Sequence, residues 1–234
     1  MNRRFAILSV LLRYPDESLR ADLPDIASAI AKAGFAPLHT RALLRLARRL
    51  GAGDPLDRQE EYVRLFDRGR STSLHLFEHV HGDTRNRGPA MIELAQAYQA
   101  AGFAIAGNEL PDYLPLFLEF LAVAPPETAR MMLSQAAPII DQLHARLLAR
   151  AQAPARAYAA VAASAMAEIG AAPQAKPTAE DEQGDEDELA ALDAAYEDAP
   201  VVFGPENDPD RTNVRASMSA MISRLKRLRA TGAL

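Results

Sequence analysis

The sequence predicts an all-α protein, and three observations carry this prediction. The 234 residues are rich in Ala and Leu, which favour helices. Only 6% of the residues are aromatic and Trp is absent, which disfavours strands. No segment of useful length alternates apolar and polar residues with the period of two that a half-buried strand requires. We therefore expect a single helical domain over residues 1–170, followed by a different kind of segment over residues 171–234.

The first predicted helix lies in the N-terminal segment. Its apolar residues recur at helical spacing from Ile7 to Leu12, and it ends before Pro15, because the residue preceding a proline avoids the α conformation. Arg13 interrupts the apolar run and no small-residue cleavage site follows. These features favour an amphipathic helix over a signal peptide.

Three further helices are predicted before residue 70. The second covers about 18–33 and stops at Gly34, and the third begins at Thr40 and closes at Gly51. Asp54-Pro55 then supplies an N-cap followed by proline at the first helical position, which predicts a fourth helix that contains Tyr62, Leu65 and Phe66.

The remaining elements are predicted from caps and stops. The Ser71–Ser73 cluster can cap a short helix that ends at Gly82. Asp112 can cap a helix that starts at Tyr113 and tolerates Pro115 in its first turn. Further helices are expected over 89–101, 126–150 with a kink or break at Pro138, and 154–169.

Charge divides the chain into three parts. Residues 1–176 hold 20 Lys/Arg and 18 Asp/Glu, residues 177–210 hold 13 acids and no base, and residues 211–234 hold 6 bases and no acid. We expect an acidic, partly disordered segment, since blocks of like charge are usually solvated. Residues 189–204 either dock on the body or stay disordered, and the basic end is expected to form an amphipathic helix that contacts the chain rather than lipid.

Composition excludes several classes of function. Without cysteine the chain has no disulfide, thiolate nucleophile or Cys-ligated metal. No apolar stretch reaches the roughly 18 residues of a membrane span, so we expect no stable membrane insertion. The near-neutral body argues against nucleic-acid binding, and no glycine-rich phosphate loop or G-x-S-x-G elbow occurs.

One motif supports a competing, enzymatic interpretation. His75-Leu-Phe-Glu78-His79 fits the H-x-x-E-H pattern, with a further imidazole at His81. On one helix, His75 and His79 would share a face and could bind zinc, with Glu78 as general base. The apolar neighbours of these residues look instead like a core stripe, so a zinc-dependent hydrolase stays the alternative.

A second unusual segment runs from Leu110 to Leu121. Its apolar residues cover most of a helix circumference, which predicts burial. Asp112 and Glu119 are acids at the edges of this apolar element. Asp112 is either an N-cap only, or one of two acids on the rim of a groove that accepts an apolar peptide with basic residues.

The chain resembles the NarJ-type assembly chaperones of respiratory nitrate reductase, within the TorD-like redox-enzyme maturation chaperones. The resemblance is carried by Leu12-Arg-Tyr-Pro-Asp16, Asp54-Pro-Leu-Asp57, Tyr62-Val-Arg-Leu-Phe-Asp-Arg-Gly-Arg70, Thr72-Ser-Leu-His-Leu-Phe-Glu-His-Val-His-Gly82, Arg85-Asn-Arg-Gly88 and Glu109-Leu-Pro-Asp-Tyr-Leu-Pro-Leu-Phe-Leu-Glu-Phe-Leu121. A weaker match to the family occurs at Tyr196–Gly204. Tyr113 departs from the pattern, since the family more usually has His there, so an imidazole role at that position is lost.

The resemblance implies a TorD-like helical fold and a cytoplasmic protein that is not an enzyme. It implies binding of the N-terminal segment of the nitrate reductase catalytic (alpha) subunit, which is held during insertion of the molybdenum cofactor. We expect no resident cofactor or metal. The residues expected to bind the peptide are Tyr62, Leu65, Phe66, Phe77, His79, Asp112, Tyr113, Leu116 and Glu119.

Overall fold

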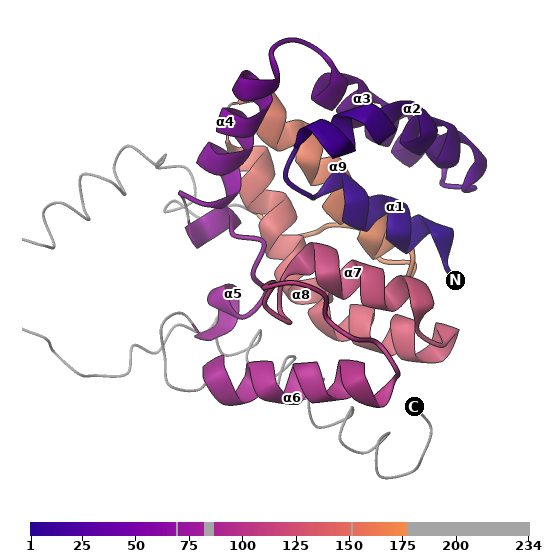
Figure 1. Ribbon diagram of the computed structural model, residues 1–234, viewed down its shortest axis with the longest axis vertical. Helices are drawn as coiled ribbons and strands as arrows, with labels where there is room; N and C mark the ends of the chain where they lie inside the picture. The colour runs from indigo at the N-terminus through magenta and orange to yellow at the C-terminus, as the bar shows by residue number, and fades with distance from the viewer. Residues whose placement is uncertain (69, 82–86, 151, 177–234) are drawn as a thin grey trace, which may run out of the picture.

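The computed structural model confirms the all-α class. It describes residues 1–68, 70–81, 87–150 and 152–176 (Figure 1). In these ranges the secondary structure is helical, apart from one isolated antiparallel bridge between His75 and Tyr113. None of the helices in these ranges is both long and apolar enough to cross a bilayer. The expected acidic segment and basic helix fall in residues 177–234, outside the described part.

The first half of the chain forms one side of the molecule. Helices α1 (Arg3–Leu11), α2 (Glu17–Lys32), α3 (Pro37–Gly51) and α4 (Pro55–Phe66) follow one another, and α2 packs along α3. They occupy the upper part of the view (Figure 1). Asp54 Oδ1 accepts a hydrogen bond from Leu56 N at 2.9 Å, which confirms the predicted cap of α4.

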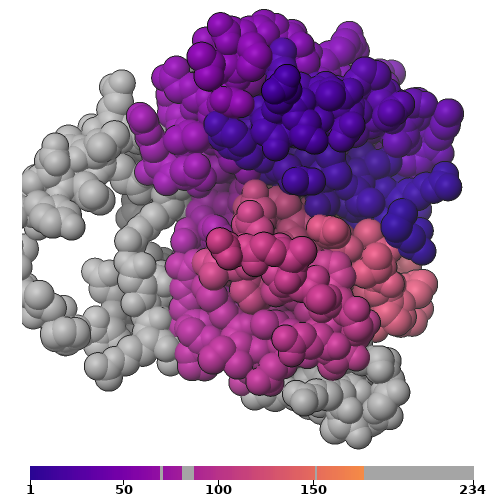
Figure 2. Space-filling view, in the orientation of Figure 1, coloured from indigo at the N-terminus to yellow at the C-terminus, as the bar shows by residue number. Residues whose placement is uncertain are grey.

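The second half forms the other side. The turn η1 (Arg70–Thr72), the short α5 (Glu78–His81) and α6 (Arg87–Ala100) are followed by α7 (Leu114–Val123), α8 (Pro126–Ala149) and α9 (Ala153–Ala167). The indigo and violet first half lies above the rose helices α6–α8 in the space-filling view (Figure 2). α9 packs against α3 of the first half and against α8 of the second, while α1 packs on α7.

One hydrophobic core joins the two halves. Phe5, Leu46, Phe117, Ile140 and Ala162 come from five different helices and all belong to this cluster. Burial of the four larger side chains in this set contributes roughly 1.5–3 kcal/mol each. Leu74, Leu76 and Phe77 belong to the same cluster, so the segment between α4 and α7 packs on this core.

Several predicted boundaries are corrected by the structure. α3 begins at Pro37 rather than at residue 40, since its proline at the first turn needs no N–H partner. α8 continues through Pro138 without a break. The helix expected from the Ser71–Ser73 cluster is reduced to η1 and α5, because residues 74–76 pair with residues 112–114 instead.

The predicted cap of α7 is also wrong. Its N-cap is Tyr113, whose side chain accepts no hydrogen bond from the first turn. The Asp112 carboxylate is turned toward other partners, described below.

Candidate functional site

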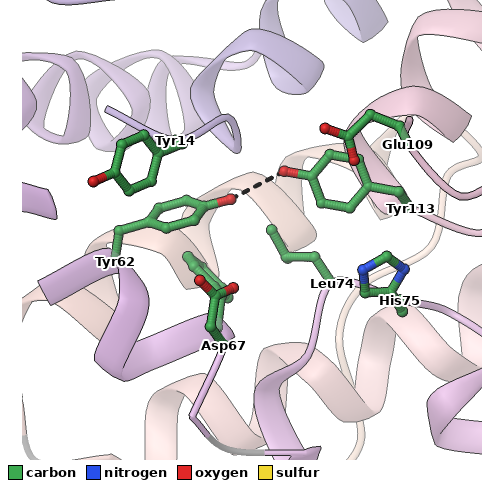
Figure 3. Close-up of a pocket in the computed structure, with 8 residues that line it drawn as sticks. Tyr14, Tyr62, Asp67, Leu74, His75, Glu109 and Tyr113 are labelled. Carbon is green, nitrogen blue, oxygen red and sulfur yellow. Dashed lines mark hydrogen bonds between the residues drawn. The ribbon is translucent and has the colours of Figure 1, made fainter. Parts of the chain in front are cut away.

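A pocket of about 230 Å³ lies where the two halves of the molecule meet. Its walls come from four places in the chain: the turn after α1, the C-terminal end of α4, the extended segment before α5, and the segment that leads into α7 (Figure 3). The residues that line it are Tyr14, Tyr62, Phe66, Asp67, Leu74, His75, Glu109 and Tyr113.

The pocket has an apolar floor and an acidic rim. Tyr62, Phe66 and Leu74 are buried and form the floor. Tyr14 is 42% exposed, and Asp67 and Glu109 are exposed too. Aromatic rings pack edge to face across the floor, with Tyr62 centred 5.5 Å from Tyr14 and 4.8 Å from Phe66. The floor is thus closely packed, while the rim is open to solvent.

The two tyrosines at the centre are joined by a hydrogen bond. The Tyr62 hydroxyl donates to Leu12 O at 2.8 Å, because a carbonyl can only accept. Tyr62 has one hydroxyl hydrogen, so the 3.1 Å contact between the two phenols is a bond donated by Tyr113 (Figure 3). Burial is the main cause that raises the pKa of both hydroxyls, so both stay protonated near neutral pH.

The backbone sets His75 beside Tyr113. Leu76 N donates to Asp112 O at 2.9 Å and Leu114 N donates to Leu74 O at 2.8 Å. These two bonds form the isolated bridge and bring the His75 and Tyr113 rings to a 5.4 Å centroid distance. The extended segment before α5 is therefore fixed to the start of α7.

Behind the pocket, Asp112 is fully buried and accepts from that same segment. Its Oδ2 accepts from Phe77 N at 3.1 Å, and its Oδ1 lies 3.2 Å from His75 Nδ1. Arg87 at the start of α6 lies 3.7 Å from Oδ2. Burial of the ring lowers the pKa of His75, but the bond to Asp112 and the charge of that carboxylate outweigh it, so the pKa of His75 is raised.

His79 is used in a different network. Its Nε2 lies 2.8 Å from Ser73 O and therefore donates, while its Nδ1 lies 2.9 Å from Arg146 Nη1 and therefore accepts. Burial and the adjacent Arg146 guanidinium lower the pKa of His79 to about 4. His79 is thus a neutral imidazole that links the α5 region to α8.

These contacts overturn the geometry of the zinc alternative. α5 begins at Glu78, so His75 lies outside the helix and does not share a helical face with His79. Both ring nitrogens of His79 are already hydrogen-bonded. The described residues contain no group of three side chains that could hold a metal ion.

The residues expected to bind a peptide fall into three sets. Tyr62, Phe66 and Tyr113 are brought together in the pocket. Leu65, Phe77 and Leu116 are buried in the core beside it. His79, Asp112 and Glu119 do not line the pocket: the first two serve the networks above, and Glu119 is exposed on α7.

Sequence reasoning missed Tyr14, Asp67, Leu74 and Glu109 as pocket residues, and it considered His75 as a metal ligand. Tyr14, Asp67 and Glu109 each belong to a motif that carries the family resemblance. Tyr14 and Asp67 follow the ends of α1 and α4, and Glu109 is the first residue of its motif. An acid directly after a predicted helix, as at Asp67, is a signal that was available, since helix C-termini disfavour negative charge.

The comparisons with known proteins decide the family. The chain matches the family described as nitrate reductase delta subunit over residues 16–159. It is 41% identical over 198 residues to the nitrate reductase molybdenum cofactor assembly chaperone NarJ of Escherichia coli (strain K12). These residues cover 84% of this chain and 83% of that protein. The chain belongs to the nitrate reductase delta subunit family.

Other relatives have similar names. It is 36% identical over 201 residues to a probable chaperone of the same kind, NarW of Escherichia coli (strain K12), with 86% and 84% of the two chains covered. It is 37% identical over 143 residues to the probable NarJ of Bacillus subtilis (strain 168), with 61% and 77% covered. All three relatives are named as assembly chaperones or probable assembly chaperones, which confirms the prediction of a chaperone rather than an enzyme.

Proposed function

We propose that this chain is an assembly chaperone of nitrate reductase that works in the cytoplasm. In this proposal it binds the N-terminal segment of the catalytic subunit and holds it while the molybdenum cofactor is inserted. The observation that carries the proposal is the pocket with an aromatic floor and an acidic rim, in a chain whose relatives are named as chaperones of this assembly.

The size of the pocket supports a peptide rather than the cofactor as its occupant. A volume of about 230 Å³ is smaller than the roughly 300–1,000 Å³ of pockets that enclose a whole small molecule. It suits one or two side chains of a longer ligand that lies over the surrounding surface. Tyr14 and Leu110, 42% and 40% exposed, offer apolar surface at the pocket and next to Glu109.

The nine residues expected from the sequence keep different roles in this proposal. Tyr62, Phe66 and Tyr113 contact the bound segment directly. Leu65, Phe77 and Leu116 hold the floor in place from the core, as Asp112 and His79 hold the segment before α5. Glu119 is an outlying acid on the exposed face of α7.

Calorimetric titration tests the proposal. The full chain is titrated with a synthetic peptide of the first ~25 residues of the nitrate reductase catalytic subunit from the same organism, a length that suits an extended or helical peptide ligand. We expect saturable one-to-one binding, and no binding of a peptide with the same composition in scrambled order.

A pair of matched variants locates the binding. Tyr14→Ala removes an exposed pocket side chain and should weaken binding about fivefold or more, since burial of an aromatic ring is lost. Leu56→Ala removes a 71% exposed side chain at the start of α4 and should leave binding unchanged. Absence of saturable binding to the wild-type chain contradicts the proposal.

A further inference from the structure

The charges on the pocket rim have no local explanation. Asp67 is the C-cap of α4, where the helix dipole disfavours negative charge. Glu109 lies before α7 and also faces the pocket (Figure 3). Within the described residues neither carboxylate is in an ion pair. Partial burial raises the pKa of Asp67 in spite of the opposing effect of nearby His75, so the described part of the fold supplies no partner that fully stabilises the negative form of this carboxylate. The site therefore holds negative charge that the fold itself does not use.

The hydrogen-bonding groups of the pocket also favour a positive ligand. Both hydroxyl hydrogens of the central tyrosine pair are already donated in hydrogen bonds, that of Tyr62 to Leu12 O and that of Tyr113 to the Tyr62 hydroxyl. The hydroxyls thus have no hydrogen to donate to an anion, whereas the ring faces and the two carboxylates attract a cation.

Positive groups near the pocket do not reverse this balance. His75 lines it, but its Nδ1 faces the buried Asp112 carboxylate, which offsets a charge on the ring. The charge of Arg13 lowers the pKa of the Tyr113 hydroxyl, but Arg13 does not line the pocket and is exposed to solvent.

We infer that this pocket is a receptor for one cationic side chain of the bound segment, an arginine, which lies against the tyrosine rings between Asp67 and Glu109. The inference rests on the proposed function for the source of the arginine. A guanidinium suits the site better than an ammonium, because its plane stacks on aromatic rings while its edge donates several hydrogen bonds to carboxylates. The volume of about 230 Å³ matches a single long side chain better than a larger ligand.

The first experiment tests the chemistry of the pocket without the peptide. The full chain, labelled with ¹⁵N, is titrated with N-acetyl-arginine methylamide and with its citrulline counterpart, which has nearly the same shape and no charge. We expect the arginine compound to shift the backbone amides around Asp67, His75 and Tyr113, with shifts at least about fivefold larger than those from the citrulline compound. Equal shifts, or a preference for N-acetyl-aspartate methylamide, overturn the inference.

Variants assign the effect to the rim acids. Asp67→Asn and Glu109→Gln keep the shape of each side chain and should each weaken binding of the arginine compound several-fold. Asp25→Asn, an exposed acid on α2 outside the pocket, should have no effect. All three positions are exposed, so the thermal unfolding temperatures should stay close to that of the wild type. A rim variant that unfolds is replaced by Asp67→Ser or Glu109→Ser, to which the same expectation applies.

The second experiment uses the peptide and separates the two proposals. Each arginine of the catalytic-subunit peptide is replaced in turn by citrulline. One replacement should weaken binding to the wild type about tenfold and have little effect on the Asp67→Asn/Glu109→Gln chain, as expected for two groups in direct contact. Tight binding of a peptide with every arginine replaced overturns the inference and leaves the proposed function standing. Binding of the arginine compound without binding of the natural peptide contradicts the proposed function and leaves the chemistry inferred for the pocket standing.

Discussion

Asp112 shows how one buried side chain positions several others. Its carboxylate accepts from Phe77 N and lies within 3.2 Å of His75 Nδ1, with no surface exposed. We expect Asp112→Ala to lower the free energy of unfolding by about 3 kcal/mol, because it leaves the buried Phe77 N–H and the His75 Nδ1 without their acceptor, while Arg87 keeps its closer partner Glu78 at 3.0 Å. Urea denaturation at pH 7 measures this.

The control for that variant is Asp25→Ala, an exposed acid that should change the free energy of unfolding by less than about 0.5 kcal/mol. A loss below 1 kcal/mol for Asp112→Ala would mean that the carboxylate is not needed to hold the segment before α5.

His79 should make stability depend on acidity. Its pKa is about 4 in the fold and near 6.5 when unfolded, so between these values the unfolded chain binds a proton that the fold excludes. Stability is therefore fully present above pH 6.5, falls as the pH drops toward 4, and levels off below. His79→Gln, which can still donate to Ser73 O, should reduce the loss between pH 7 and pH 4.5 by about 2 kcal/mol.

His75 acts in the opposite direction, since its pKa is raised in the fold. Its contribution is present below the unfolded pKa and is lost as the pH rises through the higher folded value. Comparison of His79→Gln with the wild type at each pH cancels this effect, because His75 is common to both chains. An unchanged pH profile in the variant would contradict the assignment to His79.

At the scale of elements, local signals predicted helices better than they predicted side-chain roles. Asp54-Pro55 starts α4 as expected, because capping is decided within four residues. The cap expected from Asp112 failed because its carboxylate serves Phe77, 35 residues away. For the same reason the H-x-x-E-H motif gave no helix from His75: that stretch pairs with the start of α7. Long-range pairing leaves no local pattern in the sequence.

The α7 helix provides a test of how far the bound segment extends. Glu119 and Val123 are exposed on an otherwise mostly buried helix. If the segment passes from the pocket along this stripe, Glu119→Lys should weaken peptide binding at least about tenfold, because it replaces an attractive charge by a repulsive one. Calorimetric titration with the catalytic-subunit peptide measures the change.

Thermal unfolding should be nearly unaffected by Glu119→Lys, since the side chain makes no buried contact. Glu119→Gln is the matched control and should produce a smaller loss. If Glu119→Lys binds like the wild type and folds normally, the bound segment does not reach this part of α7.

For the whole molecule, the core gives a prediction about its minimal folding unit. The core cluster runs from Phe5 to Met166, and the described chain beyond it is tied back where Gln174 N and Ala175 N donate to the Asp141 carboxylate at 2.9 and 3.0 Å. We therefore expect the folded unit to extend to residue 176, slightly beyond the end predicted at residue 170. A fragment of residues 1–176 should unfold at about the same temperature as the full chain.

A fragment of residues 1–152 should fail to fold cooperatively, because it lacks α9 and exposes the faces of α3 and α8 that α9 covers. Calorimetry of both fragments makes the comparison. A large loss of stability in the 1–176 fragment would show that residues 177–234 contribute to the fold.

The distribution of tyrosines has a practical consequence for spectroscopy. The chain has six Tyr and no Trp, and Tyr14, Tyr62 and Tyr113 all line the pocket. Half of the groups that give the protein its ultraviolet emission therefore stand at the place where a ligand would bind. A ligand without aromatic residues should change the tyrosine emission in proportion to occupancy. Tyr14→Phe, which removes one exposed emitter, should reduce that change, so the unlabelled protein carries its own optical probe.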